Sequence, residues 1–203
     1  GENLLLGQTQ GDEVLSLGNA PFAELANKIA NANESSTITL DDDYLYTDEF
    51  GNKEGILINK SLTIDGGGHT IDGGGASRIF NVLNDGVVLK NIVFMNARAE
   101  GNGGAVCGNC IVTDCTFQQN YVTGDGGALF GGSAVNCIFI GNCAENHGGA
   151  ISNGNAKDSR FTDNNYAGVS GGAIHAGSAE NCYFGGNSVK NHGGALSYSV
   201  AVG

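Results

Sequence analysis

The chain has 203 residues and an unusual composition, with 35 glycines against one proline, one methionine and no tryptophan. Glycine does not recur at every third position and proline is nearly absent, which excludes collagen and proline-rich disorder. With 40% hydrophobic and 15% charged residues, the chain has enough apolar side chains to fold. The formal net charge of −12 disfavours nucleic acid and anionic membrane surfaces as partners.

The first twenty residues lack the positive and long apolar regions of a signal peptide, and no apolar stretch approaches the roughly 20 residues that span a bilayer. We therefore expect a soluble, already processed chain that is not inserted in a membrane. Residues 1–18 are expected to form an extended leader.

A capping helix is predicted within residues 19–34. Its apolar residues recur at helical spacing: Phe22, Leu25, Ala26, Ile29 and Ala30. Asn19 and Pro21 are start signals, and Glu24 lies in the first turn. Such a helix would cover the first coil of a solenoid, whose strand edges and core would otherwise be open.

Short apolar runs separated by glycine, asparagine, aspartate and serine follow from residue 35 and predict strands. The irregular early strands are expected at residues 37–40, 56–58, 61–64, 70–71 and 79–82. From about residue 87 the pattern becomes regular, with two motifs that each recur every 22 or 23 residues. A Gly-Gly-Ala-aliphatic motif begins at Gly103, Gly126, Gly148, Gly171 and Gly193, and Phe-x-x-Asn begins at Phe117, Phe139, Phe161 and Phe184, with a degenerate copy at Phe94 and Asn96.

This period predicts a parallel β-helix over residues 35–203, with three short strands per coil. Leucine-rich repeats have a similar length but need a leucine pattern that these units lack. Equivalent residues should stack about 4.8 Å apart along the axis. The predicted interior rows are Phe94, Phe117, Phe139, Phe161 and Phe184; Ile92, Cys115, Cys137, Ser159 and Cys182; and Val106, Leu129, Ile151, Ile174 and Leu196. Asn120, Asn142, Asn164 and Asn187 should bond backbone groups at a turn and in the next coil.

Two family resemblances rest on these motifs. Residues 56–73, which contain KSLTIDGGGHTIDG, together with RIFNV at 78–82 and FAELANKI at 22–29, resemble the start of the β-helix in archaeal, methanogen adhesin-like surface proteins. The Gly-Gly-Ala-aliphatic and Phe-x-x-Asn repeats are similar to those of chlamydial polymorphic outer-membrane proteins. The resemblance covers roughly residues 20–200. It implies a right-handed parallel β-helix that is exposed outside the cell, belongs to a larger polypeptide and serves adhesion.

The chain stops at Gly203 shortly after a repeat, without the C-terminal cap or anchor of such proteins. We therefore expect a fragment, with end-to-end self-association through its open last coil.

Parallel β-helices also include polysaccharide lyases and hydrolases, whose sites gather carboxylates on one row. The candidate row lies three residues before each phenylalanine: Asn91, Asp114, Asn136, Asp158 and Asn181. Asp114 and Asp158 would be about 9.6 Å apart, near the upper limit of about 9.5 Å for an inverting pair. The alternation of asparagine and aspartate favours a turn-stabilising ladder instead. Arg78, Arg98 and Arg160 fall at unrelated positions of the repeat, which argues against a lyase base.

Other candidate ligands have simpler interpretations. Asp41, Asp42, Asp43, Asp48 and Glu49 could hold calcium but are typical of an acidic surface turn. His147 and His192 precede glycine pairs two coils apart, too far to share a metal, and His69 and His175 are isolated. Cys107 and Cys110 form a lone CxxC. Cys115 and Cys137 are close enough for a bridge, although free, mostly buried thiols are favoured.

The sequence therefore predicts no catalytic, cofactor-binding or metal-binding residues, and no enzyme activity. A cell-surface, adhesin-like or structural role outside the cell is favoured, with another cell or a glycan as the partner. A carbohydrate-binding module and a β-helix polysaccharide lyase or hydrolase are the alternatives. No aromatic platform is evident, because Tyr44, Tyr46, Tyr121, Tyr166, Tyr183 and Tyr198 occupy different positions of the repeat.

Overall fold

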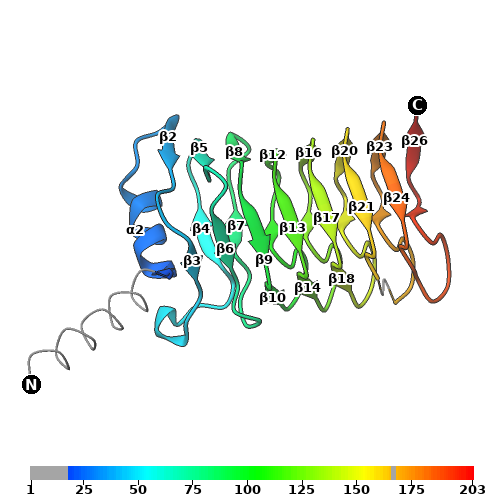
Figure 1. Cartoon of the computed structure of the whole chain (residues 1–203), viewed down its shortest axis with the longest axis horizontal. Coiled ribbons are helices and arrows are strands. Elements are labelled where there is room, and N and C mark those ends of the chain that lie inside the picture. Colours follow the sequence, from blue (N-terminus) through cyan, green and yellow to red (C-terminus); the bar gives the residue numbers. More distant parts are fainter. Residues whose placement is uncertain (1–17, 166–167) are drawn as a thin grey trace, which may run out of the picture.

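The computed structural model of the chain describes residues 18–165 and 168–203. The predicted leader therefore lies outside the described residues, apart from Gly18. In the described part, the chain winds through successive coils along one axis, with the N-terminal helix at one end and the last strand at the other (Figure 1). The paired strands are parallel. The predicted all-β parallel β-solenoid is confirmed.

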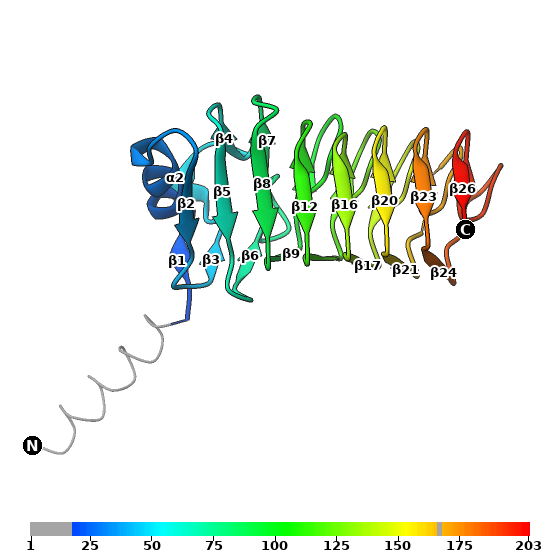
Figure 2. The same ribbon diagram turned by 90° about the horizontal axis from the view of Figure 1, so that it is seen from above.

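Two long sheets contain eight strands each among the described residues. Sheet A consists of β1 (Ala20–Pro21), β3 (Tyr44–Leu45), β6 (Thr70–Asp72), β9 (Val93–Met95), β13 (Thr116–Gln118), β17 (Ile138–Ile140), β21 (Arg160–Thr162) and β24 (Tyr183–Gly185). Sheet B consists of β2 (Ser36–Thr39), β5 (Leu62–Asp65), β8 (Val87–Lys90), β12 (Ile111–Thr113), β16 (Ser133–Val135), β20 (Asn155–Lys157), β23 (Ser178–Glu180) and β26 (Val200–Val202). Figure 2 shows the strands of sheet B side by side along the axis.

A third long sheet and a short fourth one complete the walls. Sheet C consists of β4 (Ile56–Ile58), β7 (Phe80–Val82), β11 (Val106–Cys107), β15 (Leu129–Phe130), β19 (Ile151–Ser152), β22 (Ile174–His175) and β25 (Leu196–Ser197). Sheet D consists of β10 (Arg98–Ala99), β14 (Tyr121–Val122) and β18 (Cys143–Ala144). The sequence predicts three strands per coil, and sheet D is a short fourth strand at one corner of three coils.

The helix α2 (Phe22–Asn31) lies at the N-terminal end of the solenoid, and a 3₁₀ turn, η1 (Asp48–Phe50), follows in the next coil. Phe22, Leu25 and Ile29 of α2 are fully or almost fully buried in the core. Ala26 is half-buried, but Ala30 is exposed, so the buried face is narrower than predicted. Strand β1 precedes the helix and pairs with β3, so the parallel pairing begins upstream of residue 35.

The ends of α2 also differ in detail from the prediction. Pro21 is the N-cap residue and no side chain caps the helix, so Asn19 does not act as a start signal. At the C-terminal end, the Lys60 ammonium donates to the carbonyl oxygens of Ala30 and Ala32 at 2.8 and 2.9 Å. A lysine from the following coil therefore satisfies carbonyls that a helix end leaves free.

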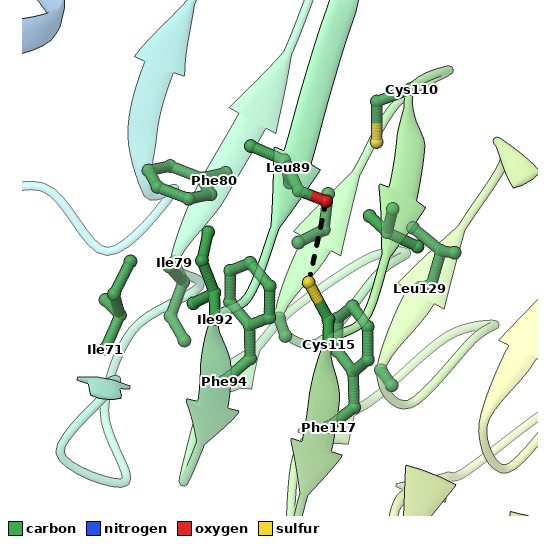
Figure 3. Close-up of a cluster of buried hydrophobic side chains, with 14 of the residues drawn as sticks. Ile71, Ile79, Phe80, Leu89, Ile92, Phe94, Cys110, Cys115, Phe117 and Leu129 are labelled. Carbon is green, nitrogen blue, oxygen red and sulfur yellow. Dashed lines mark hydrogen bonds between the residues drawn. The ribbon is translucent and has the colours of Figure 1, made fainter. Parts of the chain in front are cut away.

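The phenylalanine row forms a continuous stack in sheet A. Neighbouring rings between Phe94 and Phe184 have centroids 4.7 to 5.0 Å apart and are parallel within 13°. Figure 3 shows the first two rings of the row, Phe94 and Phe117, with Phe80 packed near Phe94. Phe184 is only half-buried, because no further coil covers it within the described residues. The predicted register is confirmed, and the predicted burial holds for four of the five rings.

The other interior rows also follow the predicted register. Val106 pairs with Leu129, and the row continues through Ile151 and Ile174 to Leu196. In the cysteine row, Cys115 and Cys137 are buried, and the Cys115 thiol donates to the Leu89 carbonyl oxygen (Figure 3).

The asparagine row forms a buried ladder at the corner after sheet A. The side-chain amide of Asn120 donates to Asn142 Oδ1 at 2.9 Å, and the same bond repeats from Asn142 to Asn164 and from Asn164 to Asn187. Each amide also donates to the phenylalanine carbonyl of the preceding coil, as Asn142 does to Phe117. The predicted bonding to backbone groups is confirmed, but these groups lie in the preceding coil, and the partner in the next coil is the asparagine side chain. In the coil before that of Asn120, the equivalent position is occupied by Ala97 and not by Asn96, because the backbone N–H of Ala97 donates to Asn120 Oδ1.

The paired glycines occupy the corner before sheet C. The first glycine of each pair has a positive φ, for example 71° at Gly126. The second, such as Gly127, lies against the carbonyl oxygen of its equivalent one coil further on, so a Cβ atom would collide with backbone. Both positions thus require glycine for different reasons, one conformational and one steric. This explains why the pair recurs in every regular coil.

Candidate functional site

The row of asparagine and aspartate residues proposed as a catalytic candidate forms turns between sheets B and A. All five residues have φ between 49° and 53°, in the left-handed region that asparagine and aspartate tolerate best after glycine. Asn136 Nδ2 donates to Asp114 Oδ1 at 2.5 Å, and Asn181 Nδ2 donates to Asp158 Oδ1 at 2.6 Å. Each carboxylate is thus held by the amide of the next coil, as the turn-ladder interpretation predicts.

The histidines are arranged differently from the prediction. The rings of His147 and His175 stack with centroids 4.3 Å apart, so His175 is not isolated. His147 Nδ1 lies 2.9 Å from Asp125 Oδ1, and His175 Nδ1 lies 3.1 Å from the hydroxyl of the buried Ser170. Burial and, secondarily, the neighbouring His147 lower the pKa of His175. His192 lies two coils from His147, as predicted, because His147 pairs with Ser170 in the next coil and Ser170 pairs with His192 in the one after.

The acidic turn and the cysteines do not converge on a metal site. Within residues 18–165 and 168–203, no group of three potential ligands among histidine, cysteine, aspartate and glutamate is close enough to hold an ion. Asp41 pairs with Lys28 at 2.9 Å, and Asp43 lies 3.1 Å from His69 Nδ1. All six thiols are free, but three are half-buried and not fully buried: Cys107, Cys143 and Cys182. Burial raises the pKa of the Cys110 thiol in the CxxC to about 12, which disfavours a reactive thiolate.

Arg78 links two loops of the solenoid by hydrogen bonds, a role that the sequence analysis does not predict. The residue is 4% exposed, and its guanidinium donates to the carbonyl oxygens of Gly103, Glu100 and Asn102, each at 2.8 Å. It also donates to the carboxylate of Glu54 at 3.0 Å. Arg78 therefore ties the loop after η1 to the corner after β10.

These two tied segments border a depression at the corner of sheet D. One hollow of about 550 Å³ is lined by Lys53, Glu54, Arg98 and Glu100, among others. A second hollow of about 400 Å³ is lined by residues that include Asp72, Asn96, Arg98, Gln119 and Tyr121. Both hollows share Gly75 and Arg98 and are therefore neighbours, and we call the two together the corner groove.

Arg98 lies at the centre of the corner groove. The register of β10 and β14 places it beside Tyr121, with its guanidinium carbon 4.2 Å from the centre of the tyrosine ring. No carboxylate forms an ion pair with Arg98 in the described part of the chain. Arg160 lies over Tyr183 at the same distance of 4.2 Å, but on the outer face of sheet A. The other described tyrosines also have partners at separate places: Tyr44 lies under Lys28, Tyr46 packs against Phe22 and Phe50, and Tyr198 packs against His175. Tyr166 lies outside the described residues.

Comparison with known proteins supports one of the two resemblances. The family model described as the Chlamydia polymorphic membrane protein repeat matches residues 114–132 and 136–154. No curated protein and no solved structure matches the chain. The resemblance to archaeal, methanogen adhesin-like proteins therefore has no support from these comparisons.

The matched segments correspond to successive coils of the solenoid. Each begins at the turn ladder, with Asp114 or Asn136, and continues through a buried phenylalanine, an asparagine of the ladder and a glycine pair. The sequence features that the repeat shares are thus those that set the register of the coils. In the parts of the chain that the structure describes, no helix has the length and apolar character needed to cross a membrane. Two successive coils of this parallel β-solenoid are thus similar to the Chlamydia polymorphic membrane protein repeat.

Proposed function

We propose that this chain is a non-catalytic, structural segment of a cell-surface, adhesin-like protein, which presents its outer surface to other cells or to glycans outside the cell. The observation that carries the proposal is the pair of membrane-protein repeats that coincide with two coils of a continuous solenoid. A solenoid of this kind is long relative to its cross-section and has an extended side surface, which suits a stalk or an attachment surface.

The polar rows argue for a structural role and against the lyase or hydrolase alternative. Asp114 and Asp158 are engaged by the amides of Asn136 and Asn181, in turns that require their backbone conformation. A general acid or base must instead be free to reach a substrate proton. The stacking of equivalent turns is sufficient to explain why the turn geometry of this row repeats from coil to coil.

The proposal is tested by displaying the chain on a non-adherent bacterium and counting attachment to cultured cells and to glycan-coated surfaces. Bacteria that display the chain are expected to attach more than bacteria that display the anchor alone. If the two kinds of bacteria attach equally to every surface tested, the proposal is contradicted. In parallel, pectate and polygalacturonate are incubated with the purified chain, with and without Ca²⁺. Product release that disappears on Asp114→Asn or Asp158→Asn would show an enzyme instead.

A further inference from the structure

The corner groove contains the positively charged side chain of Arg98, which the interactions that hold the coils together do not require. Acidic residues outnumber lysines and arginines by 21 to 9 in the chain, and Glu54 and Glu100 line the same hollow as Arg98. Arg98 nevertheless lies on the Tyr121 ring and forms no ion pair with any described residue. A guanidinium that contacts an aromatic ring through its carbon atom still has N–H groups that can donate to a planar arrangement of acceptors.

The groove is lined by hydrogen-bonding groups, and some of them are held by hydrogen bonds to the rest of the solenoid. Its first hollow has carboxylates from Glu54 and Glu100, and hydrogen bonds from Arg78 fix the backbone of both residues. In its second hollow, Asp72 accepts hydrogen bonds from Gly74 N at 2.7 Å and from Asn96 Nδ2 at 3.4 Å. The groove thus offers both donors and acceptors, and hydrogen bonds to the solenoid fix several of its lining groups, which reduces the entropy cost of binding.

The chemistry of the groove excludes two classes of ligand. A peptide that adds a strand needs free backbone groups at a sheet edge, but Arg98 N on the edge strand β10 already donates to Ser77 O. A polyanion would meet three carboxylates, from Glu54, Asp72 and Glu100, against three cations, Lys53, Arg98 and the Arg78 that pairs with Glu54, so the groove has no excess of positive charge to attract it, on a chain with a net charge of −12. An uncharged ligand rich in hydroxyl groups fits both kinds of lining group.

We propose that the corner groove binds an uncharged, linear glycan, with the Arg98 guanidinium donating to neighbouring hydroxyl oxygens and the Glu54 and Glu100 carboxylates accepting from hydroxyl groups. The groove includes residues from consecutive coils, so a linear chain that lies along the solenoid axis can contact both hollows. This inference rests on the proposed function, because it names the class of partner that the outer surface recognises.

The test uses cellohexaose, maltohexaose, mannohexaose, chitohexaose and hexagalacturonate as probes, added at millimolar concentration to the ¹⁵N-labelled chain. At least one neutral hexasaccharide is expected to shift amide signals, and the shifts should be confined to residues of the groove such as Gly75, Arg98 and Tyr121. Hexagalacturonate should bind more weakly than that probe. Absence of binding by all four neutral probes, or signal changes confined to another face, would overturn the proposal, as would tightest binding of hexagalacturonate.

A pair of variants distinguishes a specific site from general surface charge. Arg98→Gln should weaken binding of the neutral probe about 10-fold, because a hydrogen-bonding cation contributes roughly that factor. Arg160→Gln removes the other arginine that lies on a tyrosine, outside the groove, and should leave the affinity unchanged. Equal weakening by both variants would refute the site. Attachment of displayed cells that survives Arg98→Gln would refute the glycan groove and leave the adhesin-like function standing, whereas turnover of a probe would refute the proposed function itself.

Discussion

At the scale of single residues, the asparagine ladder satisfies buried polar groups that the corner of each coil would leave unpaired. Asn142 illustrates this, because its side chain lies in the interior and both ends of its amide are used. Its Oδ1 accepts from the backbone and side-chain N–H groups of Asn120, and its Nδ2 donates to Phe117 O and Asn164 Oδ1. One side chain thus connects three coils.

Replacing this side chain should therefore be costly. Asn142→Ala leaves the Asn120 donors and the Phe117 carbonyl buried without partners, and each such group costs about 1–3 kcal/mol. We expect a loss of about 3 kcal/mol or more in the free energy of unfolding, measured by urea denaturation. Asn136→Gly is the matched control, because it removes an exposed asparagine of the turn ladder and keeps the left-handed backbone accessible. A loss as large for the control as for Asn142→Ala would show that burial of the ladder is not the cause.

The stacked histidines predict a specific dependence of stability on pH. The pKa of His175 is lower in the folded chain than the ordinary value of about 6.5, so the unfolded chain takes up a proton more readily as the pH falls. The stabilisation by the neutral ring is complete above pH of about 6.5 and is lost as the pH falls through the folded pKa.

Urea denaturation near pH 8 and near pH 5.5 measures this effect. The wild-type chain should lose more stability between the two conditions than His175→Gln does. His192→Gln, which removes an exposed histidine outside the stack, serves as the comparison. If the two variants change the pH dependence of stability equally, burial of His175 against His147 is not the cause of that dependence.

At the scale of elements, each strand of sheet A contributes one phenylalanine to a row that runs through all regular coils. The rings on β13, β17 and β21 are covered on both faces, whereas the ring on β24 is covered on one face. The energetic weight of one side chain therefore depends on the place of its coil along the axis.

Truncation of two rings tests this dependence. Phe139→Ala should reduce the free energy of unfolding by about 3–5 kcal/mol, as expected for a fully buried phenylalanine. Phe184→Ala should cost clearly less, because its ring is already half-exposed. Both values are available from the same chemical denaturation experiment, and equal losses would mean that the end coil is as tightly packed as the interior.

The same rows explain what could be predicted from the sequence. Phe117 and Phe139 are the same residue type one period apart, and equal residues at equal spacing define the register. Arg98 and Tyr121 are also one period apart, but they are different residue types, so no repeated letter marks their contact. The contact between His147 and His175 joins different positions of the coil, before a glycine pair and after an aliphatic residue, which alignment of repeats cannot bring together. Arg78 lies in the irregular early coils, where no period applies.

At the scale of the whole molecule, the two ends of the solenoid differ. Helix α2 packs on the first coils, but β24, β25 and β26 each pair on one side only within the described residues. A hollow of about 330 Å³ at this end is lined by apolar side chains that include Phe184, Leu196 and Val202. Open strand edges beside exposed apolar groups favour pairing with another chain.

A polypeptide of these 203 residues should therefore self-associate through the end that carries β26. Sedimentation velocity should show species larger than a monomer as the concentration rises. Val200 and Val202 are 63% and 56% exposed, so changing both to lysine should suppress association without loss of folding. A monomer at all concentrations, or association that the double variant leaves intact, would contradict this prediction.

The direction of the hydrogen bonds between coils also decides how the solenoid responds to tension. These bonds run along the axis, while the covalent chain winds around it, so a force applied to the two chain ends peels strands off one coil at a time. Each regular coil that detaches releases 22 or 23 residues, which extend to about 75–80 Å. Because neighbouring coils hold together through similar rows, successive coils yield at similar forces. A solenoid built in this way lengthens in steps under load and limits the force that it transmits.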